Sequence, residues 1–223
     1  MKKLILGVLF CLLTPCLSFG DVGISVPIDK IYSAKNYTDT DEVQIIITGT
    51  LPSECYHLTN TTVSLERLGF LKIVQYATED RDRMCPYNLV TYEKSIVLGK
   101  LLAGSYLIHS DKTQVRATIV ISRSSRSPQP YPAPVTEASI RNGLLHLKGV
   151  FPNPCVSLDR VDVAYQQDVI SANPIMTACD RVSEALEIPF ALDVKLDNTP
   201  KERFLLHVKT ANGFLDTLQD GNL

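Results

Sequence analysis

The sequence predicts an all-β protein built from two tandem β-sandwich domains with one intradomain disulfide each. Apolar residues recur with a period of two, and a Gly–Pro–Cys turn occurs twice, about 100 residues apart. The 223 residues are 45% hydrophobic and 21% charged, a balance typical of globular chains, which excludes disorder and a multi-span membrane protein. The formal net charge of −2 argues against a nucleic-acid-binding protein, because such a protein needs a basic face.

The N-terminus has the three parts of a secretory signal peptide. Lys2 and Lys3 are followed by the apolar run 4–13, and small residues, Ser18 and Gly20, occupy positions −3 and −1 of a cleavage after residue 20. We therefore expect residues 1–20 to be removed and the mature chain to be periplasmic or extracellular.

Two alternatives remain open for this segment. The uncharged run 4–20 has 17 residues, whereas a membrane span needs about 20, and Pro15 and Ser18 break the end of the run. Leu13 lies three residues before Cys16, as in lipoproteins, but Pro15 is a poor fit before a lipidated cysteine. The sequence therefore favours a mature chain with no transmembrane segment and no lipid, in which Cys11 and Cys16 are lost with the signal peptide.

Alternating apolar residues predict the strands in chain order. They occur at 22–28, 43–47, 71–73, 115–121, 145–151 and 204–208. Turn-forming clusters at 38–41, 59–61, 142–143 and 197–200 separate these runs. Only Asp180–Ile188, which precedes Pro189, has the spacing of a helix.

An internal repeat predicts the domain organisation. Gly49–Cys55 reads G-x-L-P-x-x-C, and Gly149–Cys155 reads G-x-F-P-x-x-C. Further on, residues 105–109 parallel residues 203–207, which pairs His109 with His207. A Ser- and Pro-rich run between the copies is typical of an extended spacer. We therefore expect domain 1 at 21–122, a linker at 123–134 and domain 2 at 135–223.

Each repeat is about the size of an immunoglobulin-like sandwich, which has roughly 100 residues. Immunoglobulin domains proper pack a Trp against a disulfide that joins the two sheets, but this chain has no Trp and its cysteines are too close in sequence. The likeness is therefore one of architecture, and we expect each disulfide near an end of its sandwich.

Four cysteines remain in the mature chain, and export predicts that they are oxidised. Three pairings are possible, and the duplication favours Cys55–Cys85 and Cys155–Cys179. A metal or redox site is the alternative, but the chain has no C-x-x-C and no histidine pair at zinc-ligand spacing.

No catalytic motif of a hydrolase, metalloprotease or nucleotide-binding enzyme occurs, and we expect no enzyme activity, cofactor or metal. Alternation places His109, His146 and His207 on solvated strand faces. His57 lies close to Cys55, but a Cys–His catalytic pair needs a free thiolate, and a disulfide at Cys55 would remove it. A calcium cluster at Asp39, Asp41 and Glu42 lacks the twelve-residue loop pattern.

The mixed-charge loop before Cys85 is the best candidate for a recognition surface, because loops on rigid sandwiches often bind partners. Its residues are Glu79, Asp80, Arg81, Asp82 and Arg83.

The first half resembles an Ig-like module of bacterial exported proteins, and the function of that module is mostly unassigned. The resemblance depends on the strand that leads into the G-x-L-P-x-x-C turn, on the later Cys85 and on Gly104-Ser105-Tyr106. The resemblance covers residues 43–121 well and 144–208 less well, and it implies fold and location but no catalytic residue. We expect a non-catalytic exported binding protein of the cell envelope with a protein partner. A secreted protease inhibitor and a periplasmic pilus-type chaperone are the alternatives.

Overall fold

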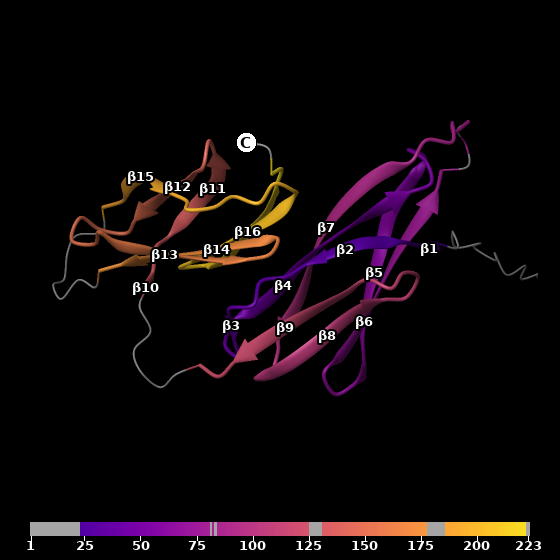
Figure 1. The fold of residues 1–223 in the computed structure, drawn as a ribbon, viewed down its shortest axis with the longest axis horizontal. Coiled ribbons are helices and arrows are strands. Elements are labelled where there is room, and N and C mark those ends of the chain that lie inside the picture. The colour runs from indigo at the N-terminus through magenta and orange to yellow at the C-terminus, as the bar shows by residue number, and fades with distance from the viewer. Residues whose placement is uncertain (1–22, 81, 83, 125–130, 178–185, 222–223) are drawn as a thin grey trace, which may run out of the picture.

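The computed structural model describes residues 23–80, 82, 84–124, 131–177 and 186–221 (Figure 1). Over these residues the chain is all-β, with seventeen strands and no helix, and no helix there is long and apolar enough to cross a membrane. The strands form four sheets: two come from residues 24–122 (the first half) and two from residues 131–219 (the second half).

In the first half a six-stranded sheet faces a three-stranded sheet. The larger sheet has the order β1 (Ile24–Val26), β6 (Phe70–Glu79), β8 (Gly104–Ser110), β9 (Arg116–Ser122) and β3 (Tyr37–Thr38), with β5 (Tyr56–Arg67) paired to β6. The smaller sheet has the order β2 (Ile28–Tyr32), β4 (Glu42–Leu51) and β7 (Val90–Lys100). The β6–β8 and β3–β9 pairs are parallel, and the other pairs are antiparallel.

The second half repeats this strand order. One sheet has the order β10 (Tyr131–Pro132), β14 (Val169–Met176), β16 (Phe204–Thr210) and β17 (Gly213–Gln219), with β13 (Leu158–Gln166) paired to β14. The other has the order β11 (Val135–Arg141), β12 (Leu144–Phe151) and β15 (Ile188–Lys195). The β14–β16 pair is parallel, like β6–β8, and among the strands that the structure describes only β3 has no counterpart.

The repeated glycine lies where the first strand of each half passes from one sheet to the other. Pro27 separates β1 from β2, and Pro134 precedes β11 in the same way. A side chain at Gly49 would come within 2.5 Å of the Tyr92 ring and even closer to the Pro27 carbonyl oxygen. A side chain at Gly149 would meet Phe190 and Pro134 in the same arrangement. The glycine of the repeat therefore makes room for the crossing strand.

Each half has its own apolar core, and most of the core residues named here belong to the runs that alternation marked. Ile28, Ile45, Ile47, Ile73, Ile108 and Ile119 are fully buried in the first half. Ile140, Leu145, Leu147, Phe204, Leu206 and Val208 have at most 1% of their surface exposed in the second. Burial of one face of each sheet against the other accounts for the period of two.

The two halves also contact each other, as Figure 1 shows where β16 lies beside the first half. Val169 and Leu205 belong to the core cluster of the first half. Three ion pairs surround this apolar contact: Lys30–Asp168 at 2.9 Å, Arg203–Glu93 at 2.6 Å and Lys209–Asp41 at 3.5 Å.

Several sequence expectations differ from the structure or lie beyond it. Tyr131 and Pro132, expected in the linker, pair with β14, and Ala133 is fully buried, so the second sandwich begins earlier than predicted. Ile188, expected to end a helix, begins β15 instead. The expected signal peptide at 1–20 and residues 178–185, which hold most of the expected helix, lie outside the described residues.

Candidate functional site

A disulfide-tethered segment lies between β6 and β7 at one end of the first sandwich, and we call its described residues, 80, 82 and 84–89, the tethered loop. The predicted Cys55–Cys85 bond is present, with the two Cα atoms 5.9 Å apart. The N–H of Asp80 also donates a hydrogen bond to the carbonyl of Cys55 at 2.9 Å. Cys55 is buried, so the loop is fixed to the core where β5 begins.

The tethered loop presents large apolar side chains to solvent. Tyr87 is 94% exposed, Leu89 is 68% exposed, and Met84 is fully exposed. Residues 84–89 form no regular strand, so their backbone can fit a partner without breaking a sheet. Exposed aromatic and aliphatic side chains on a cross-linked loop are suited to bind an apolar pocket, because little conformational entropy is lost on association.

The charged residues that the sequence indicated contribute less to this surface. Glu79 is the last residue of β6, and the carboxylate of Asp80 accepts the N–H of Asp82 at 3.2 Å. Arg81 and Arg83 lie outside the described residues. The sequence reasoning missed the apolar residues that follow, although Met84 and Tyr87 flank Cys85 and Pro86 and could have been noticed from that position.

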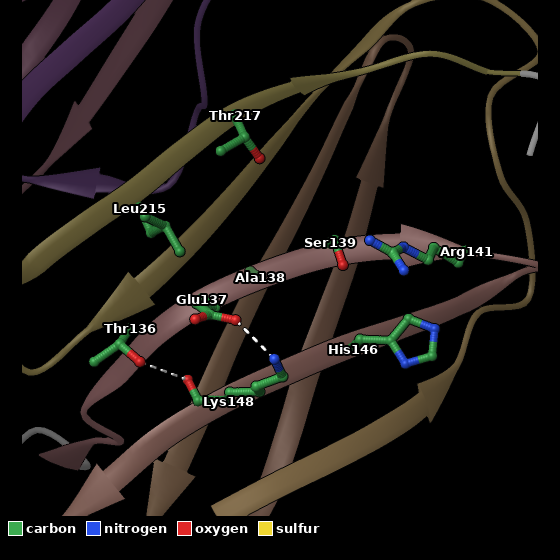
Figure 2. Close-up of a pocket in the computed structure, with 9 residues that line it drawn as sticks. All are labelled: Thr136, Glu137, Ala138, Ser139, Arg141, His146, Lys148, Leu215 and Thr217. Atoms are coloured by element: carbon green, nitrogen blue, oxygen red, sulfur yellow. Dashed lines mark hydrogen bonds and ion pairs between the residues drawn. The ribbon is translucent and has the colours of Figure 1, made fainter.

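A concave surface lies on the second half, where β11, β12 and β17 meet (Figure 2). Its volume is about 530 Å³, and several of the polar groups that line it pair with one another or with neighbours. Lys148 contacts Glu137 at 2.9 Å, and His146 contacts Asp193 at 2.6 Å. Ser139 lies opposite His146 in the β11–β12 pairing, but the imidazole contacts Asp193, and among the described residues no hydrogen bond joins it to the Ser139 hydroxyl.

The histidines occupy two kinds of environment. His109 contacts Glu66 at 3.0 Å and, like His146, keeps part of its side chain exposed. The prediction for His207 was wrong: its side chain is fully buried and contacts the buried Asp216 at 2.6 Å. The strand face that alternation marked as solvated is covered by Phe214, whose ring stacks on the imidazole, and by Tyr37 of the first half.

A His–Asp pair resembles part of a nucleophilic triad, but this one is enclosed. The Nε2 of His207 has no hydrogen-bond partner and is buried. The Tyr37 and Phe214 rings lie 5.1 and 4.5 Å from the imidazole, centre to centre. Burial also raises the pKa of Tyr37, with Asp216 adding to the effect. A substrate would have no access, so the pair acts in packing between the two halves.

The acidic turn considered for calcium uses its carboxylates within the fold. Asp41 accepts the N–H of Thr38 at 2.7 Å, and Asp39 accepts the N–H of Ser124 at 2.8 Å. The hydrogen bond from Ser124 holds the pKa of Asp39 below its usual value. Among the described residues no three acidic, histidine or cysteine side chains gather closely enough to hold a metal ion.

The described sheets define a protein with β-sandwich architecture. A family model described as the ORF11 beta-sandwich domain matches residues 45–121, from β4 through β9. That match supports a β-sandwich module in the first half and includes both ends of the Cys55–Cys85 bond. No curated protein and no solved structure matches the chain.

Proposed function

We propose that the protein is a non-catalytic, exported binding protein of the bacterial cell envelope, with two tandem Ig-like domains and the tethered loop as its recognition site. One observation carries this proposal: Met84, Tyr87 and Leu89 are exposed together on a loop that a disulfide fixes to the sandwich. The N-terminal signal pattern and the disulfide support export, because disulfides persist in oxidising compartments.

The partner is inferred to be a protein with an apolar pocket. Burying one Tyr or Leu side chain stabilises a complex by roughly 1.5–3 kcal/mol, so three anchors give a substantial part of a micromolar affinity. The flanking Glu79 and Asp80 would lie at the rim of such an interface, where charges affect association rate and specificity more than affinity.

A secreted protease inhibitor is the second candidate, and the same loop favours it. Met84, Cys85 and Pro86 form an irregular segment that is held by a cystine and fully accessible at Met84. A protease cleft accepts a segment of this kind when it is rigid and protrudes. Inhibition of any protease at micromolar protein, lost on substitution of Met84, would favour this candidate over a general binding protein.

Affinity capture from the native envelope tests the proposal. The tagged chain should retain a specific partner, and the triple variant Met84→Ser, Tyr87→Ser, Leu89→Ser should lose at least about tenfold in affinity for that partner. Leu102→Ser is the matched control, because Leu102 is 79% exposed but lies on the separate β7–β8 connection. Equal retention by the triple variant and the unchanged chain would exclude the tethered loop as the site.

Catalysis is tested separately. Activity-based profiling of the purified chain with hydrolase probes and chromogenic esters, glycosides and peptides should give no turnover above background. Turnover of a defined substrate that a single substitution abolishes would overturn the non-catalytic assignment.

A further inference from the structure

The free edge of β5 in the first half is available for strand pairing. Among the described strands β5 pairs only with β6, so its other edge has no partner strand. Residues 56–65 include no Asp, Glu, Lys, Arg or Pro. Natural sheets block such edges with charges, prolines or bulges, because an open edge pairs with other chains.

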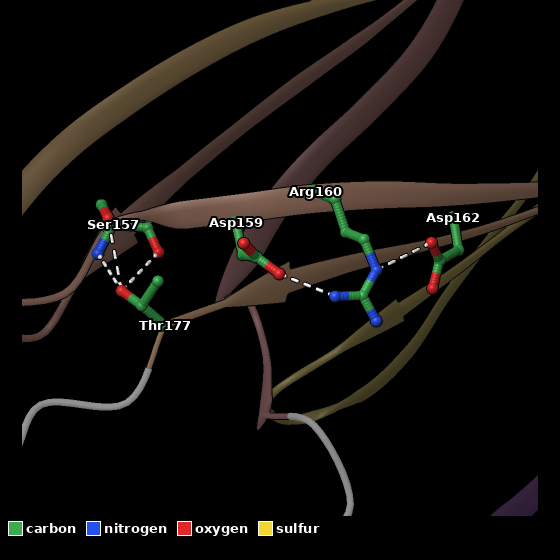
Figure 3. A network of polar contacts seen from close by, with 5 residues as sticks. All are labelled: Ser157, Asp159, Arg160, Asp162 and Thr177. Atoms are coloured by element: carbon green, nitrogen blue, oxygen red, sulfur yellow. Dashed lines mark hydrogen bonds and ion pairs between the residues drawn. The ribbon is translucent and has the colours of Figure 1, made fainter.

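The equivalent edge in the second half is blocked, as Figure 3 shows. On β13, Arg160 contacts Asp159 at 2.7 Å and Asp162 at 3.1 Å. Three of the four residues 159–162 are therefore charged. A strand approaching β13 would have to displace this network. The repeat thus has two edges at the same place in the fold, and only the edge of β5 lacks charge along its middle.

The side of β5 that faces the core is also open. Val63 and Leu65 lie opposite Ile73 and Leu71 of β6, which are buried, so these two residues point to the core side of the sheet. Even so, Val63 is 39% exposed and Leu65 is 60% exposed. Val163, the counterpart of Val63, packs against the core of the second half. An added strand would therefore gain both hydrogen bonds and apolar contacts.

The bulge in β5 limits the pairing to part of the strand. The carbonyl of Thr59 accepts the amine of Lys94 at 3.2 Å, and the carbonyl of Asn60 accepts the amide of Gln75 at 3.1 Å. These two groups are already used within the chain. The open stretch therefore runs from Thr61 to Leu65, which is about the length of an ordinary strand.

We propose that this edge is a self-association site at which β5 of a second copy pairs antiparallel to β5, centred on Val63. Such pairing places Thr62 of each copy opposite Ser64 of the other. It also places the charged end, Glu66 and Arg67, opposite the neutral Asn60 and Thr59. Like charges therefore do not meet, whereas a parallel pairing would bring the two Arg67 side chains together.

Sedimentation velocity from micromolar to submillimolar concentration tests the pairing on the purified chain. We expect a reversible dimer. The double variant Thr62→Lys, Ser64→Lys places lysines opposite lysines and should weaken dimerisation at least about tenfold, since directly opposed like charges destabilise a strand pair. Ala164→Lys on β13 is the matched control at the position equivalent to Ser64, and it should leave the dimer unchanged.

A charge exchange separates loss of pairing from loss of folding. The variant Thr62→Glu, Ser64→Glu should also be monomeric, and mixing it with the lysine variant should restore a dimer that contains one copy of each. A monomeric unchanged chain, a dimer unaffected by either variant, or a mixture that stays monomeric would overturn the proposal. Circular dichroism of each variant verifies that it is folded before the comparison.

Discussion

Replacing the glycine of the repeat with alanine should destabilise the first sandwich strongly. A Cβ at Gly49 would come within 2.5 Å of the Tyr92 ring and closer still to the Pro27 carbonyl oxygen, both less than real contacts allow. The carbonyl belongs to the backbone of the strand that changes sheet, so it cannot rotate away. Tyr92 is also held in place, because its hydroxyl donates a hydrogen bond to the same carbonyl at 2.7 Å.

Three contributions set the expected magnitude for Gly49→Ala. Overpacking costs about 1–3 kcal/mol, and disturbing the Tyr92 hydrogen bond adds about 0.5–1.5 kcal/mol. The lower entropy of alanine in the unfolded chain returns about 0.4–1 kcal/mol. We therefore expect a loss of about 2 kcal/mol, which for a chain of this size lowers Tm by about 4–8 °C.

Differential scanning calorimetry of Gly49→Ala and Gly23→Ala measures the effect against a matched control. At Gly23 the nearest atom would lie 3.5 Å from the added Cβ, an ordinary contact, so the change there should stay within about 0.5 kcal/mol. Gly149→Ala should resemble Gly49→Ala. If Gly49→Ala and Gly23→Ala melt at the same temperature, the steric account of the repeat is wrong.

Three further predictions concern single contacts. Cys85→Ser should cost about 3–4 kcal/mol, measured by urea unfolding, because the bond closes a loop with a sequence separation of 30. His207→Ala should cost about 3–5 kcal/mol by the same measurement, since it leaves the buried Asp216 without its partner. The hydrogen bond between Lys72 and Asp111 holds the pKa of Asp111 below 3.8 and that of Lys72 above 10.5. The stability from this contact should therefore be present near neutral pH. It should fall as pH drops below 3.8, where Asp111 becomes protonated, and as pH rises through the raised pKa of Lys72. Measuring Tm against pH checks this, and the Asp111→Asn variant should lack the contribution.

The sequence predicted the β architecture because alternation depends on local pattern and core burial alone. Ile45 and Ile47 are buried as the period of two requires. The Cys55–Cys85 bond followed from the repeat and is confirmed. The pairing of Cys155 with Cys179 stays a prediction, because Cys179 lies outside the described residues.

The error at His207 has a tertiary cause that no local pattern contains. Alternation correctly placed this residue on the face opposite Leu206, which is buried in the core of the second half. It could not indicate that Tyr37 from the first half covers that face. The counterpart His109 has the same place in the repeat but contacts Glu66 and keeps part of its side chain exposed. Identical strand positions therefore acquired different environments through contact between the halves.

The same contrast explains how the two halves can have different surfaces. The two halves share strand order, the crossing proline and the glycine that accommodates it, so the core is constrained equally in both. Their edges and loops carry no such constraint. In the first half, the middle of β5 lacks the charges that block β13, and the tethered loop exposes Tyr87. Substitutions at Thr62 and Ser64 should therefore affect association alone, whereas those at Gly49 should affect folding alone.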